Sequence, residues 1–232
     1  MSIKPILFNT EMVKAILAGK KTVTRRLVKE GTTNKFLLGQ CIAGDKKDIG
    51  KVGFRTNIWG GTISYINPPC NVGDVLYVRE TWQDDRLYSH SDTPGQYFYK
   101  ADKDIKCEKW RPSIHMPKEA ARIWLKVISV RVEKLQDITE EGVSEEGFGF
   151  VPPCLTLVSE DTYCDLDGPC TSPIKYCDMT MKELFGYELW NSTVSKKDLN
   201  EYGWDANPYV WVIEFDRCNK PKEGLHEQKR ND

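Results

Sequence analysis

Hydrophobic and polar residues alternate in several short stretches of this chain. Alternation of β-branched and aromatic residues with polar ones is typical of half-buried strands. The pattern predicts strands at 21–28, 61–66, 74–82, 96–100, 122–135 and 209–216. The parity of the alternation slips near Ile128 and Ser129, which indicates a β-bulge in that strand.

A helical period appears first in residues 9–19, "NTEMVKAILAG". Asn9 or Thr10 can cap this segment, and its apolar residues recur on one stripe. Gly19 stands where a left-handed C-cap belongs. The sequence therefore predicts a short helix that ends just before a run of cations.

Two further helices are indicated by their N-terminal residues. Residues 138–148 offer Thr139 as a cap followed by acidic residues in the first turn. Residues 180–190 open with a capping box formed by Thr180 and Glu183. Both segments are short, so we expect each helix to cover only a few turns.

Many strands, three or so short helices and no βαβ rhythm predict a mainly β protein with short helices, of the α+β class. No internal repeat is visible. We expect one domain over residues 1–216 and a polar, flexible C-terminal tail over 217–232. Residues 149–178 are rich in Pro, Cys and Asp, which predicts an insertion outside the core.

Composition narrows the classes of protein that fit. The chain has 232 residues and a formal net charge of -1, so it lacks the basic excess of a bulk DNA coater. No segment approaches the roughly 20 apolar residues that span a bilayer. The N-terminal stretch turns polar within ten residues and lacks the features of a signal peptide. We expect a cytoplasmic protein with no membrane partner; its oligomeric state is left open.

The eight cysteines have two interpretations. Four of them cluster in the proposed insertion, at Cys154, Cys164, Cys170 and Cys177. Zinc ligands usually come as close C-x₂₋₄-C pairs, and no such pair exists here. In a reducing compartment free thiols are the default, so we expect no metal and no cofactor. A structural metal held by this cluster is the alternative.

The stretch 18–26, "AGKKTVTRR", concentrates cations in a chain of near-zero net charge. One interpretation is structural, because cations just past a helix C-terminus complement its dipole. The other is functional, because several cations on one strand can line a pocket for an anion or a nucleotide. The residues by themselves leave both interpretations open.

The longer stretch "ILAGKKTVTRR" resembles the G-x-K-x-T-x-R signature of the ASCH family, a branch of the PUA-like β-barrel superfamily. "NVGDVLYVRETW" is similar to the family's Gly-Asp turn into a barrel strand, and "YVWVIEF" to its closing strand. "WRPSIHMP" and "YGWDANP" resemble stretches of longer ASCH proteins carried on phage genomes. The resemblance implies a PUA-like barrel decorated by helices, with a cleft beside the signature strand. The matching signature residues are Gly19, Lys21, Thr22, Thr24 and Arg26.

ASCH proteins are thought to bind RNA or modified nucleosides, and the resemblance implies such a partner here. One compact branch hydrolyses the amide of N4-acetylcytidine with a Lys, a Thr and a Glu. These match Lys21, Thr24 and, through a similar "LxxLTE"-like stretch, Glu146. The remaining candidate ligand-binding residues lie in the two signature stretches: Lys20, Thr22, Arg25, Arg26, Arg79, Glu80 and Trp82.

Amide hydrolysis needs a base, a nucleophile and a proton donor for the leaving amine. Lys21 can act as the base only if burial or neighbouring cations lower its pKa. Thr24 would attack or position a water, and Glu146 would supply the proton. Lys21 and Thr24 have opposite parity along a strand, so they share a cleft only if Lys21 precedes the strand or a bulge intervenes.

Two alternatives to hydrolysis remain at this stage. A cationic cleft flanked by aromatic residues would bind RNA without turnover. An RNA-cleaving activity is the third possibility, and it ranks lower because the set lacks the carboxylate cluster of two-metal phosphoryl chemistry. Each candidate also has a structural interpretation: Glu146 as surface charge, Trp82 as a core aromatic, and Arg25 or Arg26 as the partner of an acid such as Glu80.

Overall fold

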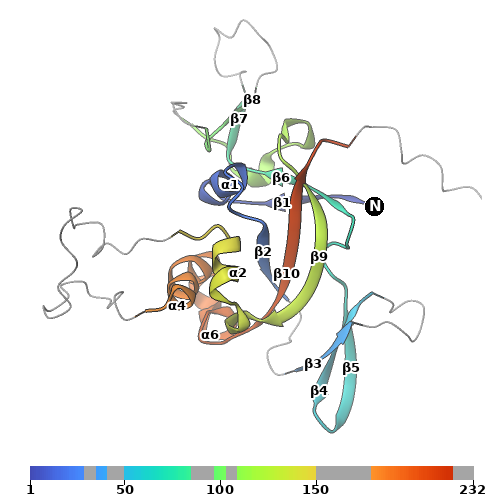
Figure 1. Ribbon diagram of the computed structural model, residues 1–232. Helices are drawn as coiled ribbons and strands as arrows, with labels where there is room; N and C mark the ends of the chain where they lie inside the picture. Colours follow the sequence, from blue (N-terminus) through green and yellow to red (C-terminus); the bar gives the residue numbers. More distant parts are fainter. Residues whose placement is uncertain (29–34, 41–49, 85–96, 103–108, 150–178, 222–232) are drawn as a thin grey trace, which may run out of the picture. The chain divides into compact units, whose positions relative to one another are not determined.

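The structure is a computed structural model that describes residues 1–28, 35–40, 50–84, 97–102, 109–149 and 179–221 (Figure 1). It is a mixed α+β protein made mainly of strands with a few short helices, which confirms the predicted class. The described strands form a five-stranded sheet in the order β1-β6-β9-β10-β2, a three-stranded sheet β3-β4-β5 and a two-stranded sheet β7-β8. Among these residues no closed barrel is detected.

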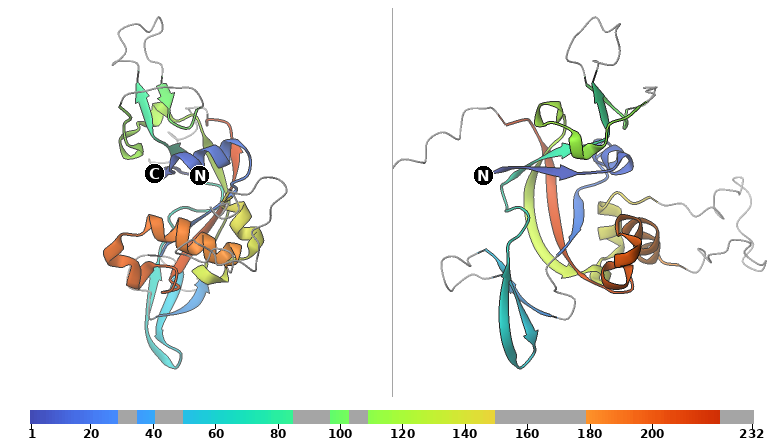
Figure 2. Two further views of the ribbon diagram at one scale, coloured as in Figure 1. Left: turned by 90° about the vertical axis from the view of Figure 1, so that its left-hand side faces the viewer. Right: turned by 180° about the vertical axis from the view of Figure 1, so that it is seen from behind.

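The chain divides into two compact units, each assembled from separate segments. The first unit contains Met1–Gly19, Cys70–Val130 and Glu214–Asp232, and the second contains Lys20–Pro69 and Arg131–Ile213. Strands β9 (Trp124–Lys134) and β10 (Tyr209–Cys218) each continue from one unit into the other, and Figure 2 shows them as long neighbouring strands. The expected single domain stays a prediction. The expected insertion lies outside the described residues, Gly149 excepted.

Strands and short helical turns make up the first unit. Besides its parts of β9 and β10, its elements are β1 (Ile3–Leu7), α1 (Thr10–Leu17), β6 (Val75–Arg79), β7 (Trp82–Asp84), β8 (Tyr97–Tyr99), η3 (Ser113–His115) and η4 (Lys118–Ala120). Strand β1 pairs with β6 in parallel, and β6 pairs with β9 antiparallel. Val75 from β6 and Trp124 from β9 belong, with Trp82 from β7, to one hydrophobic core cluster of this unit.

Helix α1 forms as its sequence predicts. The side chain of Asn9 accepts a hydrogen bond from the backbone N–H of Met12 at 2.8 Å and so caps the first turn. Val13 and Ile16 are buried on the apolar stripe. Gly19 has a φ of 71°, the left-handed conformation that lets the chain turn out of the helix.

The second unit carries β2 (Val23–Leu27) and the sheet of β3 (Phe36–Gln40), β4 (Val52–Asn57) and β5 (Gly60–Ile66). Its helical elements are η5 (Leu135–Asp137), α2 (Glu140–Glu145), α4 (Met181–Leu184), the π-helix η7 (Phe185–Trp190), α5 (Asn191–Thr193), η8 (Lys196–Asp198) and α6 (Leu199–Tyr202). The core packs Val23 from β2 against Val143 from α2 and Val210 from β10. This packing brings the signature strand and α2 together.

Several strands differ from the prediction, and β3 and β4 lie outside every predicted strand range. Strand β1 was not predicted, because Pro5 removes a backbone donor; the sheet order places β1 at an edge, where a proline is tolerated. The predicted strand 74–82 is broken, since β6 ends at Arg79 and β7 begins at Trp82. Strand β7 pairs with β8 in a separate sheet, so the chain must bend between the two. Strand β10 also extends two residues past the predicted end, to Cys218.

Candidate functional site

Lys21 lies just before β2 and is almost completely buried, with a side-chain exposure of 0%. An isolated backbone bridge pairs it with Glu146, and the N–H of Thr22 donates to the carbonyl of Glu145 at 2.9 Å. The chain entering β2 is therefore held against the end of α2. This position meets the condition that Lys21 precede the strand.

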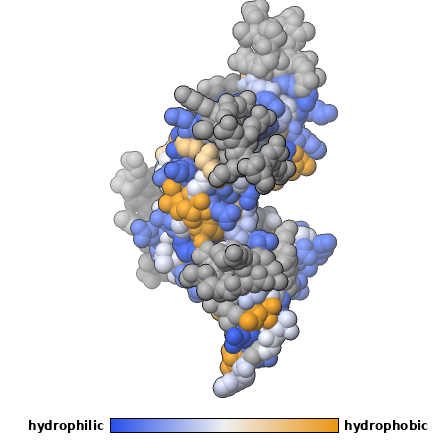
Figure 3. Space-filling view, turned by 90° about the vertical axis from the view of Figure 1, so that its right-hand side faces the viewer, coloured by the Kyte–Doolittle hydropathy of each residue, from blue (hydrophilic) through white to orange (hydrophobic). Residues whose placement is uncertain are grey.

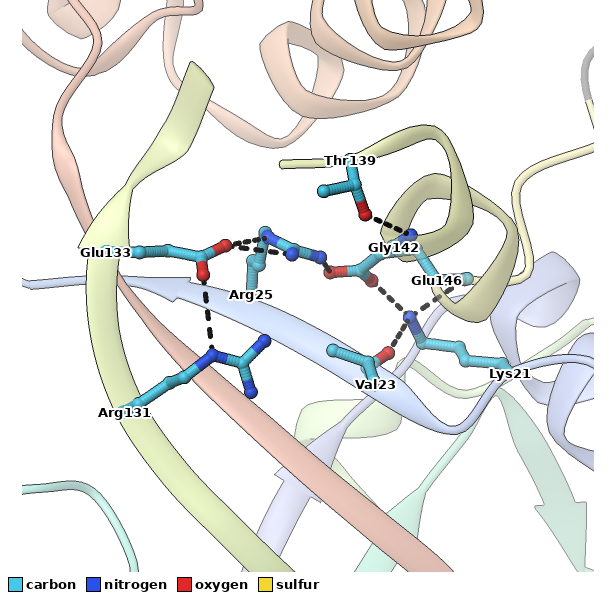
Figure 4. Close-up of polar contacts among 8 residues, drawn as sticks. All are labelled: Lys21, Val23, Arg25, Arg131, Glu133, Thr139, Gly142 and Glu146. Atoms are coloured by element: carbon cyan, nitrogen blue, oxygen red, sulfur yellow. Dashed lines mark hydrogen bonds and ion pairs between the residues drawn. The ribbon is translucent and has the colours of Figure 1, made fainter. Parts of the chain in front are cut away.

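Glu146 is the C-cap of α2, and the local sequence fixes it there. Thr139 caps the N-terminus by accepting from the N–H of Gly142, as predicted (Figure 4). At the other end, Gly147 has a φ of 72° and donates to Ser144, while Phe148 donates to Val143. These two bonds form a Schellman motif, which ends the helix at Glu146.

The carboxylate of Glu146 binds two cations from the signature stretch (Figure 4). Its Oε2 lies 2.5 Å from the Nζ of Lys21, and its Oε1 lies 3.2 Å from Nη1 of Arg25. The same Nζ donates to the backbone carbonyls of Val23 at 2.7 Å and Glu146 at 2.9 Å. Three acceptors match the three N–H donors of a lysine ammonium.

Arg25 extends the network to β9. Its Nε and Nη2 donate to Oε1 of Glu133 at 3.0 and 2.8 Å, and Arg131 lies 3.4 Å from the other oxygen of that carboxylate. Cations and carboxylates thus alternate from Arg131 through Glu133, Arg25 and Glu146 to Lys21. We call these five residues the charge network.

Burial dominates the electrostatics of Lys21. Loss of hydration lowers the pKa of its ammonium below the ordinary value, and the Glu146 carboxylate opposes this shift. The nearby Arg26 and Arg25 guanidiniums lower the pKa further. A buried lysine whose pKa is lowered is a group suited to proton transfer, and perturbed groups of this kind concentrate at functional sites.

The other signature residues are placed differently. Thr24 is buried, but alternation along β2 directs it to the face opposite Arg25, and no hydrogen bond joins it to Lys21 or Glu146. Arg26 is half-buried, whereas Lys20 and Thr22 are exposed. Of the candidate residues, Lys21, Arg25 and Glu146 therefore contact one another, and Thr24 is not part of these contacts.

Three predicted ligand-binding residues belong to the first unit. Glu80 is buried and paired with Arg122 through bonds of 2.9 and 3.0 Å, rather than with Arg25 or Arg26. Burial raises the pKa of Glu80, and Arg122 opposes that shift. Arg79 donates to the backbone carbonyls of Ile114 and Met116, while Trp82 is a buried core residue.

Sequence reasoning missed Glu133 and Arg131. Both stand on the polar parity of the predicted strand 122–135, opposite its valines. The signal that could have identified them is their charge close to the end of a predicted strand. Which acid would pair with Arg25 depends on packing that the pattern does not contain.

Within the described segments, no three His, Cys, Asp or Glu side chains are grouped as a metal site requires. Cys154, Cys164, Cys170 and Cys177 lie outside those segments. None of the helices in the described part of the chain has the length and apolar character needed to cross a bilayer.

Comparison with protein-family models, with curated proteins and with solved structures finds no significant match to this chain. The fold and the site therefore define a broad class of protein: an α+β protein with a buried network of Lys21, Glu146 and Arg25.

Proposed function

We propose that this chain is an ASCH-type protein that binds RNA or a modified nucleoside and hydrolyses the amide of an N4-acylated cytidine. The PUA-like barrel belongs to the same proposal. The observation that carries it is the contact between Lys21 and Glu146, two residues 125 positions apart that the family signature independently suggests as partners. A random pair of surface charges would have no reason to meet in a buried site.

The pair suits acid–base chemistry because it holds one labile proton. In the ion pair the proton is on Lys21; in the neutral tautomer it is on Glu146, and the net charge is the same. Burial lowers the pKa of Lys21 and so favours its neutral form, which brings this tautomer closer in energy. Neutral Lys21 would accept a proton from the attacking hydroxyl, and protonated Glu146 would donate one to the leaving cytosine amine.

Thr24 is the weakest member of the proposed set. It is buried on β2 next to the charge network, but its hydroxyl makes no hydrogen bond to Lys21. Either it attacks the acyl carbon after a local rearrangement or it positions the attacking water. If water attacks, the carbon–nitrogen bond breaks and the free acid and cytidine are released together. If Thr24 attacks, cytidine leaves first, and water then hydrolyses the Thr24 ester to release the free acid.

The test is incubation of the purified protein with N4-acetylcytidine, followed by ultraviolet absorbance. Lys21→Met and Glu146→Gln should each reduce kcat/KM by at least about a hundredfold, the usual scale of general acid–base catalysis. Thr24→Val should reduce it as well. The matched controls Lys197→Met and Glu141→Gln change exposed residues of the same unit and should keep full activity. Full activity of Lys21→Met in a folded protein would falsify the mechanism.

Binding without turnover is the second candidate, favoured by one observation. The charged groups of Lys21, Arg25 and Glu146 are bound to one another, with side-chain exposures of 0%, 3% and 4%. Such a network can stiffen a binding surface instead of performing chemistry. If the folded protein shows salt-sensitive RNA binding and no turnover of N4-acetylcytidine, this candidate replaces hydrolysis.

A further inference from the structure

The three-stranded sheet of the second unit has one buried face and one exposed face. Val52, Phe54 and Ile66 lie on the buried face, and the ring of Phe54 packs edge-on against Tyr209 at 5.3 Å. The register pairs Phe36 with Arg55 and Arg55 with Ile63, so these three residues form a row across the other face. Tyr65, opposite Gly53, shares that face because it is two residues from Ile63.

The exposed face is rich in large apolar and aromatic side chains. Phe36 is 46% exposed, Tyr65 is 41% exposed and Ile63 is 40% exposed. Sheet faces turned to solvent are normally polar. Figure 3 shows hydrophobic and hydrophilic surface side by side over the β4–β5 hairpin. A surface of this kind indicates a partner.

The tip of the hairpin carries a second unexpected aromatic. Ile58 and Trp59 form the two-residue turn between β4 and β5, closed by the side chain of Asn57, which accepts from the N–H of Trp59 at 3.0 Å. Hairpin turns usually carry Asn, Gly or Asp. Trp59 is 91% exposed, so its indole contributes almost nothing to the fold.

The charge of this region selects the kind of partner. The described residues 35–40 and 50–66 contain Lys35, Lys51 and Arg55 and neither Asp nor Glu. Arg55 stands in the row between Phe36 and Ile63 and is half-buried; its Nε is buried without a hydrogen-bond partner among the described residues. A cation flanked by open aromatic rings is complementary to a polyanion whose units carry flat rings.

We propose that this face binds single-stranded nucleic acid, with bases stacked on Phe36, Tyr65 and Trp59 and a phosphate at Arg55. Strand spacing puts Phe36 and Tyr65 about 12 Å apart on the outer strands, which leaves room for a base on each ring. Base stacking on aromatic side chains tolerates any sequence, so the selectivity is for single strands over duplex. We call Phe36, Arg55, Trp59 and Tyr65 the stacking face. It shares no residue with the charge network and does not rest on the proposed hydrolysis.

The test measures fluorescence anisotropy of a fluorescein-labelled single-stranded RNA dodecamer at low salt. Trp59→Ala and Tyr65→Ala should each weaken binding about tenfold, and the duplex of the same sequence should bind less tightly. Arg55→Gln should reduce the slope of log affinity against log salt by about 0.7. The controls Tyr187→Ala and Lys197→Gln change an exposed aromatic and an exposed cation on helical elements and should bind like the unaltered protein.

Several outcomes would overturn the stacking face. One is the absence of RNA binding at low salt; another is unchanged affinity in the stacking-face variants. Dimerisation or binding to anionic vesicles that is lost in Trp59→Ala, without RNA binding, would assign the face to a second copy or a lipid surface instead. Turnover of free N4-acetylcytidine by the same variants separates the two proposals, because it should be unchanged by Trp59→Ala and lost in Lys21→Met.

Discussion

At the scale of the residue, Lys21 is the most unusual group of the second unit. Burying an ammonium costs hydration, and the charge network restores only part of that free energy through Glu146. Replacing buried ion pairs by apolar residues is often neutral or stabilising in other proteins. The three buried members of the network, Lys21, Arg25 and Glu146, are therefore difficult to explain by stability alone, and they favour a role in chemistry or binding.

The pKa of Lys21 can be tested directly by NMR titration of its side-chain resonances. It should lie below the ordinary value for lysine; Glu146→Gln should lower it further, and Arg26→Gln should raise it, because these partners act in opposite directions. The folded state then loses this proton at a lower pH than the unfolded chain. The contribution of Lys21 to the free energy of unfolding consequently rises with pH between the two pKa values. A Lys21 pKa at or above the ordinary value would contradict this account.

At the scale of the element, α2 is a short helix whose two ends do most of the positioning. A helix of this length is marginal without caps and packing. Its Thr139 cap was predicted from the sequence "ITEEGVSEEGF", whereas its Schellman motif is a finding of the structure; Val143 anchors the helix in the core. Because Glu146 is the C-cap itself, the stability of α2 and the position of the carboxylate are coupled.

Thr139→Ala should remove the N-cap of α2 and lower the free energy of unfolding by about 1 kcal/mol. The control is Ser144→Ala, an exposed position inside the same helix, where alanine should be neutral or slightly stabilising. Chemical denaturation followed by circular dichroism measures both. If the two variants had equal stability, the Thr139 hydroxyl would not be acting as a cap.

At the scale of the whole molecule, each unit is built from segments that are distant in the chain. The first needs Met1–Gly19 together with Cys70–Val130, and the second needs Lys20–Pro69 together with Arg131–Ile213. In the second unit Val23 packs against Val143 and Val210, so its core cannot close until most of the chain has been made. Long-range contacts of this kind are slow to form because loop closure must come first.

Cutting the chain between Val130 and Arg131 should therefore leave no independently folded half. Fragments 1–130 and 131–232, prepared separately, should lack a cooperative thermal transition and near-ultraviolet circular dichroism, because each contains only part of both units. Mixing the fragments should restore part of the signal. A cooperative transition in either fragment alone would show that a unit can be completed locally.

The sequence by itself determined the local structure and the candidates. Period-two stretches gave the central strands, and caps gave α1, α2 and α4. These features follow from short-range rules, since side-chain period and capping act within a few residues. The pairing of Lys21 with Glu146 was implied instead by the resemblance of the signature stretch to a known family. The edge strand β1 escaped because Pro5 looks unfavourable until the position of the strand in the sheet is known.

Only the tertiary structure decided the partners. It put Arg25 between Glu133 and Glu146, gave Glu80 to Arg122, and directed Thr24 away from the face of Arg25. It also left the aromatic face of β3, β4 and β5 exposed to solvent. The alternation of residues along these strands does not by itself tell which of the two faces is buried. Many acidic residues of this chain have similar neighbours in the sequence, and strand register and packing select which of them pairs with a given cation. Burial of the common core fixes which strand faces which helix, and so fixes the pair.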